Sequence, residues 1–226
     1  MLIYGKNVCK EAIKNKQKIK NIYVTKNFNE DFIKNLHVHY LEKYEMDKKV
    51  DGLHQGIIME VDDFKYDKID SLFNSDNNLV VILDHLEDPH NFGAIIRTCE
   101  AAGVKAIIIP KDRSVSVNAT VVKVSTGAIS DISIIQVTNL SQTIELLKKH
   151  GYWIVGTDMT GESYDKIDYK GNTVIIIGNE GKGMGTNIKN NCDFIATIPM
   201  NGKTNSLNAS VAAGIIIFEA VKNRRS

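Results

Sequence analysis

The chain has 226 residues, of which 43% are hydrophobic and 24% are charged, and its formal net charge is +1 at pH 7. These values are typical of a water-soluble globular protein, and the length allows one large domain or a small domain beside a medium one. The net charge is too small to attract nucleic acid by itself. The longest apolar stretch, residues 211–218, is too short to span a bilayer.

Basic residues concentrate at both ends of the chain. The first twenty residues hold six lysines against one glutamate, and the last five residues hold one lysine and two arginines. These ends can contact phosphate groups, although lysine-rich helix faces in contact with solvent show the same pattern. The charge pattern alone favours the second interpretation, in which the lysines lie on helix faces in contact with solvent.

The cysteine content indicates a reducing compartment. Cys9, Cys99 and Cys192 are odd in number and widely spaced, without a Cys-x-x-Cys pair, which argues against a disulfide framework and a cysteine-based zinc site. Cys99 lies among apolar residues of a predicted helix, so we expect it to be packed and not reactive. The first ten residues contain no apolar signal core, and we expect a cytoplasmic protein.

The first 61 residues alternate between helical and strand patterns. Helices are predicted over residues 7–16 and 28–35, and strands over residues 21–25, 37–41 and 56–61. Residues 62–78 are polar and change character, which indicates a flexible linker between two domains, 1–61 and 79–226.

A second pattern begins at residue 79. Strands are predicted over residues 79–83, 106–109, 132–137, 153–155, 173–177 and 194–198, and helices over residues 92–102, 119–126, 141–150 and 207–221. Apolar strands that alternate with helices predict an α/β domain with a mostly parallel sheet and helices on both faces.

Three polar clusters each follow one of these predicted strands. They read DHLEDPHNFGAIIR (84–97), GNEGKGM (178–184) and PMNGKTNSLNAS (199–210). Turns at the carboxyl ends of parallel strands lie at one edge of the sheet, where α/β proteins place their ligand sites. We therefore expect the three clusters to converge on one pocket.

Several familiar chemistries do not fit these clusters. The first lacks the G-x-G-x-x-G of a dinucleotide fold, and in the second Lys182 is followed by Gly183 instead of the Ser or Thr of a P-loop. His85 and His90 lack a third ligand at helical spacing, so no metal site is expected. No serine stands in a G-x-S-x-G elbow, which leaves acyl transfer unsupported.

The clusters are suited to binding. Asn91 is a good N-cap for the helix that follows it, and Gly93 lies four residues before Arg97, so its missing side chain would leave room beside Arg97 for a ligand. Arg97 could equally pair with Glu100 on the helix surface. The third cluster contains more polar side chains than the capping of one helix requires, namely Asn205, Ser206 and Asn208.

Taken together, the three clusters resemble the motifs of the SpoU (TrmH-type) family of RNA ribose 2′-O-methyltransferases. The matching positions are Asn91, Gly93 and Arg97 in the first motif, Gly178, Glu180, Gly181, Gly183 and Met184 in the second, and Ile198, Pro199, Ser206, Leu207 and Asn208 in the third. Each motif is weak alone, but three in the same order over roughly 130 residues are specific.

The rest of the chain is similar to one branch of that family, the guanosine methyltransferases of large-subunit ribosomal RNA. The similarity covers YGKNVCKEAI near the start, HQGI at 54–57 and PKDRSVSVNATVVKVSTGA at 110–128. That branch carries a small N-terminal α/β RNA-binding domain with a ribosomal-protein-like fold. Asn205 departs from the small serine that the branch often has there, and it retains the hydrogen-bonding capacity.

The resemblance implies an activity, a fold and partners. The activity is methyl transfer from S-adenosylmethionine to a ribose 2′-hydroxyl, in a guanosine of ribosomal RNA or, as the alternative, in transfer RNA. The fold is a trefoil knot in the C-terminal part of the chain, which no periodicity reveals. The partners are RNA and a second copy of the chain, with no membrane and no metal, since the sulfonium already activates the methyl group.

The resemblance also implies roles for individual residues. It places Arg97 at the 2′-hydroxyl, either as the base or as a bidentate grip on the neighbouring phosphate that orients the hydroxyl. Asn91 would position Arg97 or the RNA backbone, Glu180 would orient Arg97 or the sugar, and Ser206 and Asn208 would hold the site by hydrogen bonds.

The implied cofactor site uses mainly backbone. The adenosine of S-adenosylmethionine would lie on the backbone of Gly178, Ile198 and Leu207, and Thr157 would close the same pocket.

Two other classes remain as alternatives. A non-catalytic RNA-binding protein of the same fold would be favoured if Arg97 or Glu180 were replaced, and both are present. A nucleotide-dependent oxidoreductase fits the α/β alternation, but the glycine fingerprint is missing.

Overall fold

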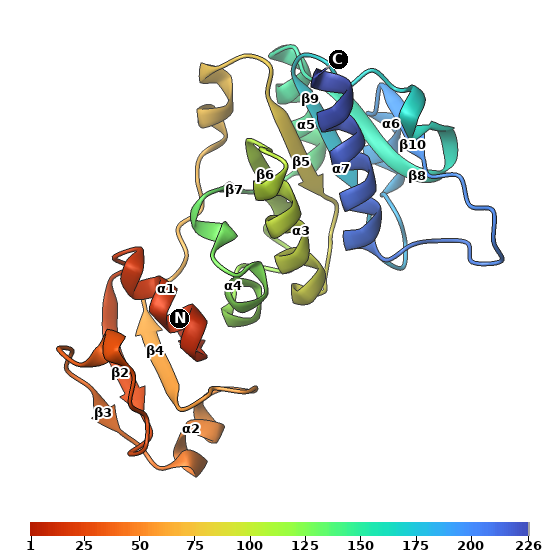
Figure 1. The fold of residues 1–226 in the computed structure, drawn as a ribbon. Helices are drawn as coiled ribbons and strands as arrows, with labels where there is room; N and C mark the ends of the chain where they lie inside the picture. The colour runs from red at the N-terminus through yellow and green to blue at the C-terminus, as the bar shows by residue number, and fades with distance from the viewer. Residues whose placement is uncertain (226) are drawn as a thin grey trace.

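The computed structural model describes residues 1–225 and contains two sheets, which define a small N-terminal domain and a large C-terminal domain (Figure 1). The elements of the small domain are β1 (Leu2–Tyr4), α1 (Lys6–Lys14), β2 (Ile19–Val24), β3 (His39–Tyr40), α2 (Lys43–Lys49) and β4 (Ile57–Val61). Its four-stranded sheet has the order β1-β4-β2-β3, in which β4 is antiparallel to both of its neighbours.

The small domain differs from the sequence prediction in three elements. The helix expected over 28–35 is only a 3₁₀ turn, Asp31–Ile33. Strand β1 and helix α2 were not expected: β1 is only three residues long, and α2 begins at a capping box built from Glu42 and Glu45 instead of the usual serine or threonine.

The large domain is an α/β structure, as predicted. Its elements are β5 (Leu79–Leu83), α3 (Pro89–Ala101), β6 (Ala106–Pro110), α4 (Ala119–Ser125), β7 (Ser133–Val137), α5 (Leu140–Lys149), β8 (Trp153–Ser163), β9 (Thr173–Ile177), α6 (Thr186–Asn190), β10 (Phe194–Thr197) and α7 (Ala209–Arg225). The sheet order is β10-β8-β9-β5-β6-β7, and every neighbouring pair is parallel.

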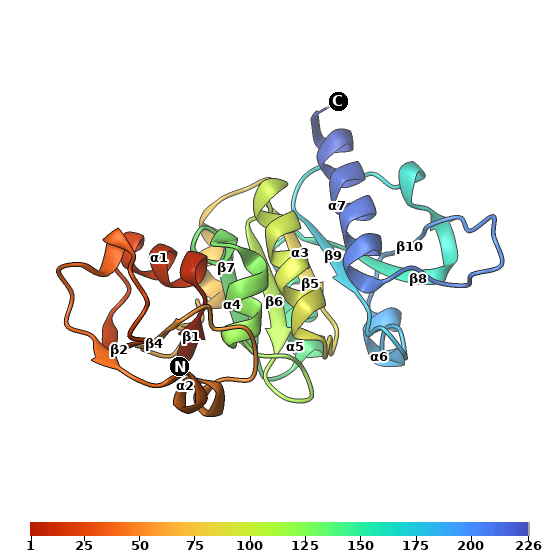
Figure 2. The same cartoon turned by 60° about the horizontal axis from the view of Figure 1, so that its bottom comes forward.

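The sheet is covered on both faces because its central strands are apolar on both sides. Every residue of β5, β6 and β9 is buried. One face packs against α3 and α7 through residues such as Phe92 and Ile216, and the other packs against α5 through Ile144 and Leu147. Figures 1 and 2 show α3 and α7 side by side on one face of the sheet.

The segment expected to be a flexible linker lies along the large domain in this structure. The Asp67 amide donates to the carbonyl of Ile134 at 2.8 Å, and the Tyr66 hydroxyl accepts from the Val117 amide at 3.0 Å. Leu72 is fully buried under the sheet. Residues 66–72 therefore contact the large domain instead of hanging free between the two sheets.

The small domain contacts α4 and the turn that follows it. Asn15 Nδ2 donates to Ser130 Oγ at 3.0 Å, and Lys123 Nζ lies 5.0 Å from the centre of the Tyr4 ring. Gly127 lies so close to Glu11 that an added Cβ would meet the carboxylate at 2.1 Å. Apolar packing adds to these contacts, because Val122 and Ala119 of α4 pack against buried residues of the small domain.

Two of the cysteines are packed inside the protein. Burial raises the pKa of the Cys9 thiol to about 12, and it raises the pKa of the fully buried Cys99 thiol as well. Within residues 1–225, no helix combines the length and the apolar character that crossing a membrane requires.

The last turn of α7 is attached to the body of the large domain by Arg224 and by Asn223, whose Oδ1 accepts from the Tyr169 amide at 3.0 Å. The Arg224 guanidinium donates to the carbonyls of Tyr169 (2.7 Å) and Gly171 (2.6 Å), to Asn77 Oδ1 (2.8 Å) and to the Asn77 carbonyl. The loop before β9 and the residues before β5 thus hold the end of the chain.

We expect Arg224→Ala to lower the free energy of unfolding by about 2 kcal/mol, because hydrogen bonds from a charged donor to partly buried carbonyls are lost. Chemical denaturation monitored by circular dichroism measures this change. Arg225→Ala is the matched control, since Arg225 is exposed. Equal stabilities of the two variants would contradict the role given to Arg224.

Candidate functional site

The first motif begins where β5 ends, and a buried aspartate organises it. Asp84 is 2% exposed, and its Oδ2 accepts from the Gly185 amide at 2.8 Å while Oδ1 contacts His85 Nδ1 at 2.6 Å. Because Gly185 follows the second motif, Asp84 joins the first two motifs at the carboxyl end of neighbouring strands. Sequence reasoning missed this residue, although a carboxylate directly after five apolar residues was a visible signal.

The expectation that Asn91 caps α3 is wrong. Asp88 is the N-cap, and its side chain accepts from the His90 amide at 2.9 Å; Pro89 takes the first helical position, which its ring favours. Asn91 therefore lies inside the first turn of α3 and is 8% exposed. Its amide is free to reach other motifs.

The second motif forms a tight loop against the end of β5. The backbones of Asn179 and Gly183 exchange two hydrogen bonds of 3.0 and 2.9 Å, and Asn179 Nδ2 donates to the carbonyl of His85 at 2.7 Å. A Cβ on Gly178 would lie 2.6 Å from Gly183 C and Met184 N, so only glycine fits there. The loop presents Glu180, which is exposed, beside the first motif.

The third motif enters the same region at the start of α7. Asn208 Oδ1 accepts from the amide of Ser210 at 2.9 Å and from its hydroxyl at 2.6 Å, so Asn208 caps the helix. Its other amide atom, Nδ2, points back and donates to Asn91 Oδ1 at 3.0 Å.

Asn91 is the junction of the three motifs. It accepts from Asn208, which is 117 residues away in the chain, and it donates through Nδ2 to Glu180 Oε1 at 3.2 Å, 89 residues away. Both ends of its amide are therefore used, and the three motifs meet at this side chain.

Arg97 lies on α3 but outside this hydrogen-bond chain. It is exposed, and its side chain has no hydrogen bond or ion pair within residues 1–225, so the alternative pairing with Glu100 is not formed. Its guanidinium is available to an external ligand.

Gly93 does not provide room beside Arg97, which corrects the sequence interpretation. A Cβ on Gly93 would lie 2.6 Å from Val124 Cβ on α4. The glycine is needed for the close approach of α3 and α4 in the interior, while Arg97, one helical turn further along α3, is exposed.

The other expected site residues lie around the junction without joining it. Thr157 is half-buried and its hydroxyl donates to the Ile176 carbonyl at 2.9 Å, which attaches β8 to β9 two residues before Gly178. Ile198 and Leu207 are partly buried at the two ends of the loop between β10 and α7. Ser206 is exposed, and no partner for its hydroxyl is found among the described residues.

The loop between β10 and α7 has a free backbone. Over residues 199–206, the described part of the chain offers no hydrogen-bond partner to any amide or carbonyl group. Unpaired backbone donors and acceptors beside the junction can bind the edge of a flat polar ligand. In residues 1–225 no three His, Cys, Asp or Glu side chains gather as a metal site.

Comparison with known protein families agrees with this arrangement. The sequence model of the SpoU rRNA Methylase family matches residues 78–218, which include all three motifs. The model described as RNA 2′-O ribose methyltransferase substrate binding matches residues 2–67. The chain therefore belongs to the SpoU methylase family.

Individual relatives match most of the chain. It is 38% identical over 237 residues to YacO of Bacillus subtilis, named for the TrmH family of tRNA/rRNA methyltransferases, with 98% of this chain and 95% of the relative covered. It is 43% identical over 192 residues to the 23S rRNA (guanosine-2′-O-)-methyltransferase RlmB of Pseudomonas aeruginosa, with 81% and 76% covered. An AdoMet-bound rRNA methyltransferase from Sinorhizobium meliloti has the same fold, with a TM-score of 0.81, 25% identity, and 98% and 86% covered.

Proposed function

We propose that this protein transfers the methyl group of S-adenosylmethionine to the 2′-hydroxyl of a ribose in RNA. The observation that carries the proposal is the Asn91 junction, which brings the three motifs of the family together at the start of the helix that also carries the exposed Arg97. The substrate we propose is a guanosine of large-subunit ribosomal RNA, which is supported by the likeness to RlmB and by the match of residues 2–67 to a substrate-binding model. Transfer RNA is the alternative, since the name of YacO includes it.

The residues around the junction fit the cofactor. S-adenosylmethionine supplies a methyl group already activated on a sulfonium, so no metal has to prepare a leaving group. Gly178, Ile198 and Leu207 would bind its adenosine through backbone groups and Thr157 would close the pocket. The unpaired backbone of residues 199–206 supports this assignment.

Arg97 is proposed to act on the RNA. An exposed guanidinium keeps its charge, so it is suited to grip the phosphate next to the target ribose and to orient the 2′-hydroxyl, while phosphate or water takes the proton. Glu180, oriented by Asn91, would position the sugar or the guanidinium. Ser206 and Asn208 would hold the site by hydrogen bonds.

The two parts of the chain are proposed to divide the work. Residues 1–61 would bind RNA through the lysines of the first twenty residues. Residues 62–78 would connect the two domains, and residues 79–226 would perform the methyl transfer. The proposed trefoil knot in the second part is supported by α7, which follows the edge strand β10 and returns to contact residues 169–171. A protein of this function belongs in the cytoplasm, where ribosomal RNA is modified.

We also propose that the protein is a homodimer through α7. Val211 and Phe218 are each 50% exposed, and because they are seven residues apart they lie on the same side of the helix. An exposed apolar stripe on a long helix favours a contact with a second copy.

We expect Val211→Glu combined with Phe218→Glu to convert a dimer into a monomer, since two carboxylates would be desolvated in the interface. Sedimentation velocity measures the mass. Leu36→Glu, which changes an exposed apolar residue of the small domain, serves as the control and should leave the dimer intact. A wild-type chain that sediments as a monomer at micromolar concentration would disprove the assembly.

Methyl transfer to bulk RNA tests the proposed function. The protein is incubated with S-adenosylmethionine that carries a labelled methyl group and with total RNA lacking the modification. We expect label in large-subunit ribosomal RNA and, after mapping, at one ribose 2′-oxygen. Label in transfer RNA only would select the alternative, and label in no RNA would refute the proposal.

A further inference from the structure

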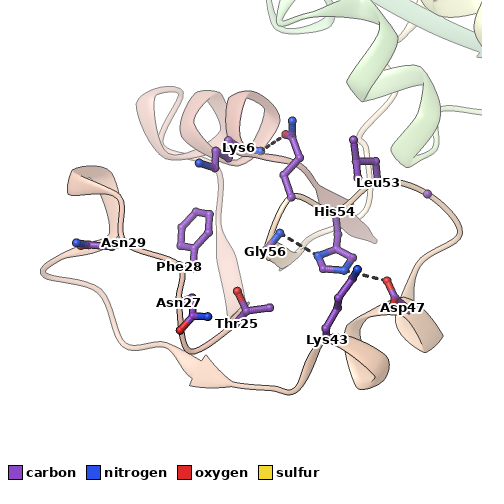
Figure 3. Close-up of a pocket in the computed structure, with 12 residues that line it drawn as sticks. Lys6, Thr25, Asn27, Phe28, Asn29, Lys43, Asp47, Leu53, His54 and Gly56 are labelled. Atoms are coloured by element: carbon purple, nitrogen blue, oxygen red, sulfur yellow. Dashed lines mark hydrogen bonds and ion pairs between the residues drawn. The ribbon is translucent and has the colours of Figure 1, made fainter.

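A cavity of about 680 Å³ lies in the small domain, within the range of pockets that bind small ligands (Figure 3). It opens at the end of the small sheet where β2 ends and β4 begins. Its lining comes from the start of α1, the segment after β2, helix α2 and the loop 52–56. None of the three motifs contributes to it.

The floor of this pocket is a histidine held in one orientation. His54 is 6% exposed, its Nδ1 accepts from the Gly56 amide at 3.0 Å, and its Nε2 lies 3.0 Å from Asp47 Oδ1. Because Nδ1 accepts, the proton of the neutral ring is on Nε2 and is directed to the carboxylate.

The loop beside His54 is preformed. Gln55 and Gly56 both have a positive φ, at 52° and 83°, and this conformation is strained for glutamine. Gln55 Oε1 accepts from the Lys6 amide at 2.9 Å, which fastens the loop to the start of α1. A pocket whose wall is rigid before binding loses less entropy when a ligand enters.

The remaining lining includes an aromatic ring, with Lys6 Nζ 5.7 Å from its centre, and three polar side chains without a partner among the described residues. Phe28 is half-buried and packs edge-on against Phe32, with ring centres 6.2 Å apart. Asn27, Asn29 and Lys43 are exposed, and no hydrogen bond or ion pair of their side chains occurs within residues 1–225. In Figure 3, Phe28 lies between α1 and the segment that carries Asn27.

This combination matches the chemistry of an unpaired nucleotide. A base that is not in a helix can stack on an aromatic ring and can offer its free edge to amide groups, and its phosphate can bind a lysine. A paired base cannot enter, because its edge and both of its faces are already occupied. The shape and the donors therefore select single-stranded over double-stranded RNA.

We propose that the pocket formed by Phe28, Asn27, Asn29, Lys43 and His54 binds one extruded nucleotide of the RNA substrate, away from the ribose that is methylated. The proposal rests on the proposed function, because it takes the substrate to be RNA. The base stacks on Phe28 above the His54 floor, and Lys43 binds its phosphate. The pocket thereby selects targets that have an unpaired nucleotide at a set distance from the methylated ribose.

Cross-linking and binding with the full chain test this proposal. The probe is a transcript of large-subunit ribosomal RNA that contains 4-thiouridine. We expect ultraviolet light to cross-link one unpaired nucleotide to the peptide that contains Phe28. We expect Phe28→Leu to weaken binding about 10-fold, because it keeps the apolar packing and loses the stacking face, whereas Phe28→Tyr binds as the wild type does.

Lys43→Ala is a second variant that should fold normally, since the Lys43 side chain is exposed and has no partner within residues 1–225. It should lower the slope of log binding constant against log salt by about one, and Phe28→Leu should leave that slope unchanged. Tyr40→Ala is the matched control, because Tyr40 is 63% exposed on β3 and does not line the pocket.

The outcomes separate this inference from the proposed function. Wild-type methyl transfer to ribosomal RNA together with unchanged binding by Phe28→Leu and Lys43→Ala would overturn the nucleotide pocket alone. Cross-links only outside residues 25–56, or equally strong competition by a fully paired duplex, would also overturn it. Absence of methyl transfer by the wild type would refute the proposed function, while the cross-link would still report on the pocket.

Discussion

Arg97→Ala is expected to reduce methyl transfer by about 10³-fold, with the affinity for S-adenosylmethionine unchanged. The guanidinium is exposed and unpaired, so its removal disturbs no internal contact of the described chain. What is lost is the positively charged, bidentate group that holds the phosphate and orients the 2′-hydroxyl. Single-turnover transfer of a labelled methyl group measures the rate, and calorimetry measures cofactor binding.

Two further variants sharpen this prediction. Arg97→Lys keeps the charge but loses the planar fork, and it should recover only a small part of the rate. Lys105→Ala removes an exposed cation at the amino end of β6, at the opposite edge of the sheet, and should have no effect. A normal rate in Arg97→Ala would remove Arg97 from the mechanism, and loss of cofactor binding would instead indicate a role in the cofactor pocket.

Asn91→Ala should lower kcat about 10²-fold, because the junction that positions Glu180 and Asn208 disappears. The same reasoning predicts a coupled effect. Once Asn91 is gone, Asn208→Ala should cost little more, so the double variant should resemble Asn91→Ala. Single-turnover rates of the wild type, the two single variants and the double variant form a double-mutant cycle that measures this coupling.

A helix cap elsewhere serves as the control for this cycle. Asn139 caps α5, where its side chain accepts from the Gln142 amide at 3.1 Å. Asn139→Ala should lower the free energy of unfolding by about 1 kcal/mol and leave kcat unchanged. Additive losses for Asn91→Ala and Asn208→Ala would show that the two amides act independently.

Much of the large domain could be predicted because its local pattern is strong. Strand β5 is a run of five apolar residues and β9 has four after Thr173, and all of them are buried. Such runs between helical segments define an α/β sheet. The small domain was predicted less well, because β1 is only three residues long and the helix expected over 28–35 is only a 3₁₀ turn. Strand β8 extends to Ser163, where polar residues gave no strand pattern.

The sequence predicted which residues belong to the candidate site, but it did not predict which of their side chains contact each other. The order of the motifs identified Asn91, Glu180 and Asn208. Their hydrogen bonds join residues 89 and 117 positions apart, and no local spacing encodes such a pairing. Gly93 also shows that spacing does not predict tertiary contacts. Its spacing suggested open space beside Arg97, whereas Val124 on α4 occupies the space next to Gly93.

The amino-acid sequence by itself therefore determined the fold class, the three motifs and the family they resemble, because periodicity and motifs can be read along the chain without knowing which distant residues meet. Only the tertiary structure decided that Asn91 joins the three motifs, that Arg97 stays unpaired, and that His54 and Phe28 form a pocket far along the chain from those motifs. The physical reason is that strand order and helix packing, which act over long sequence distances, choose which side chains meet.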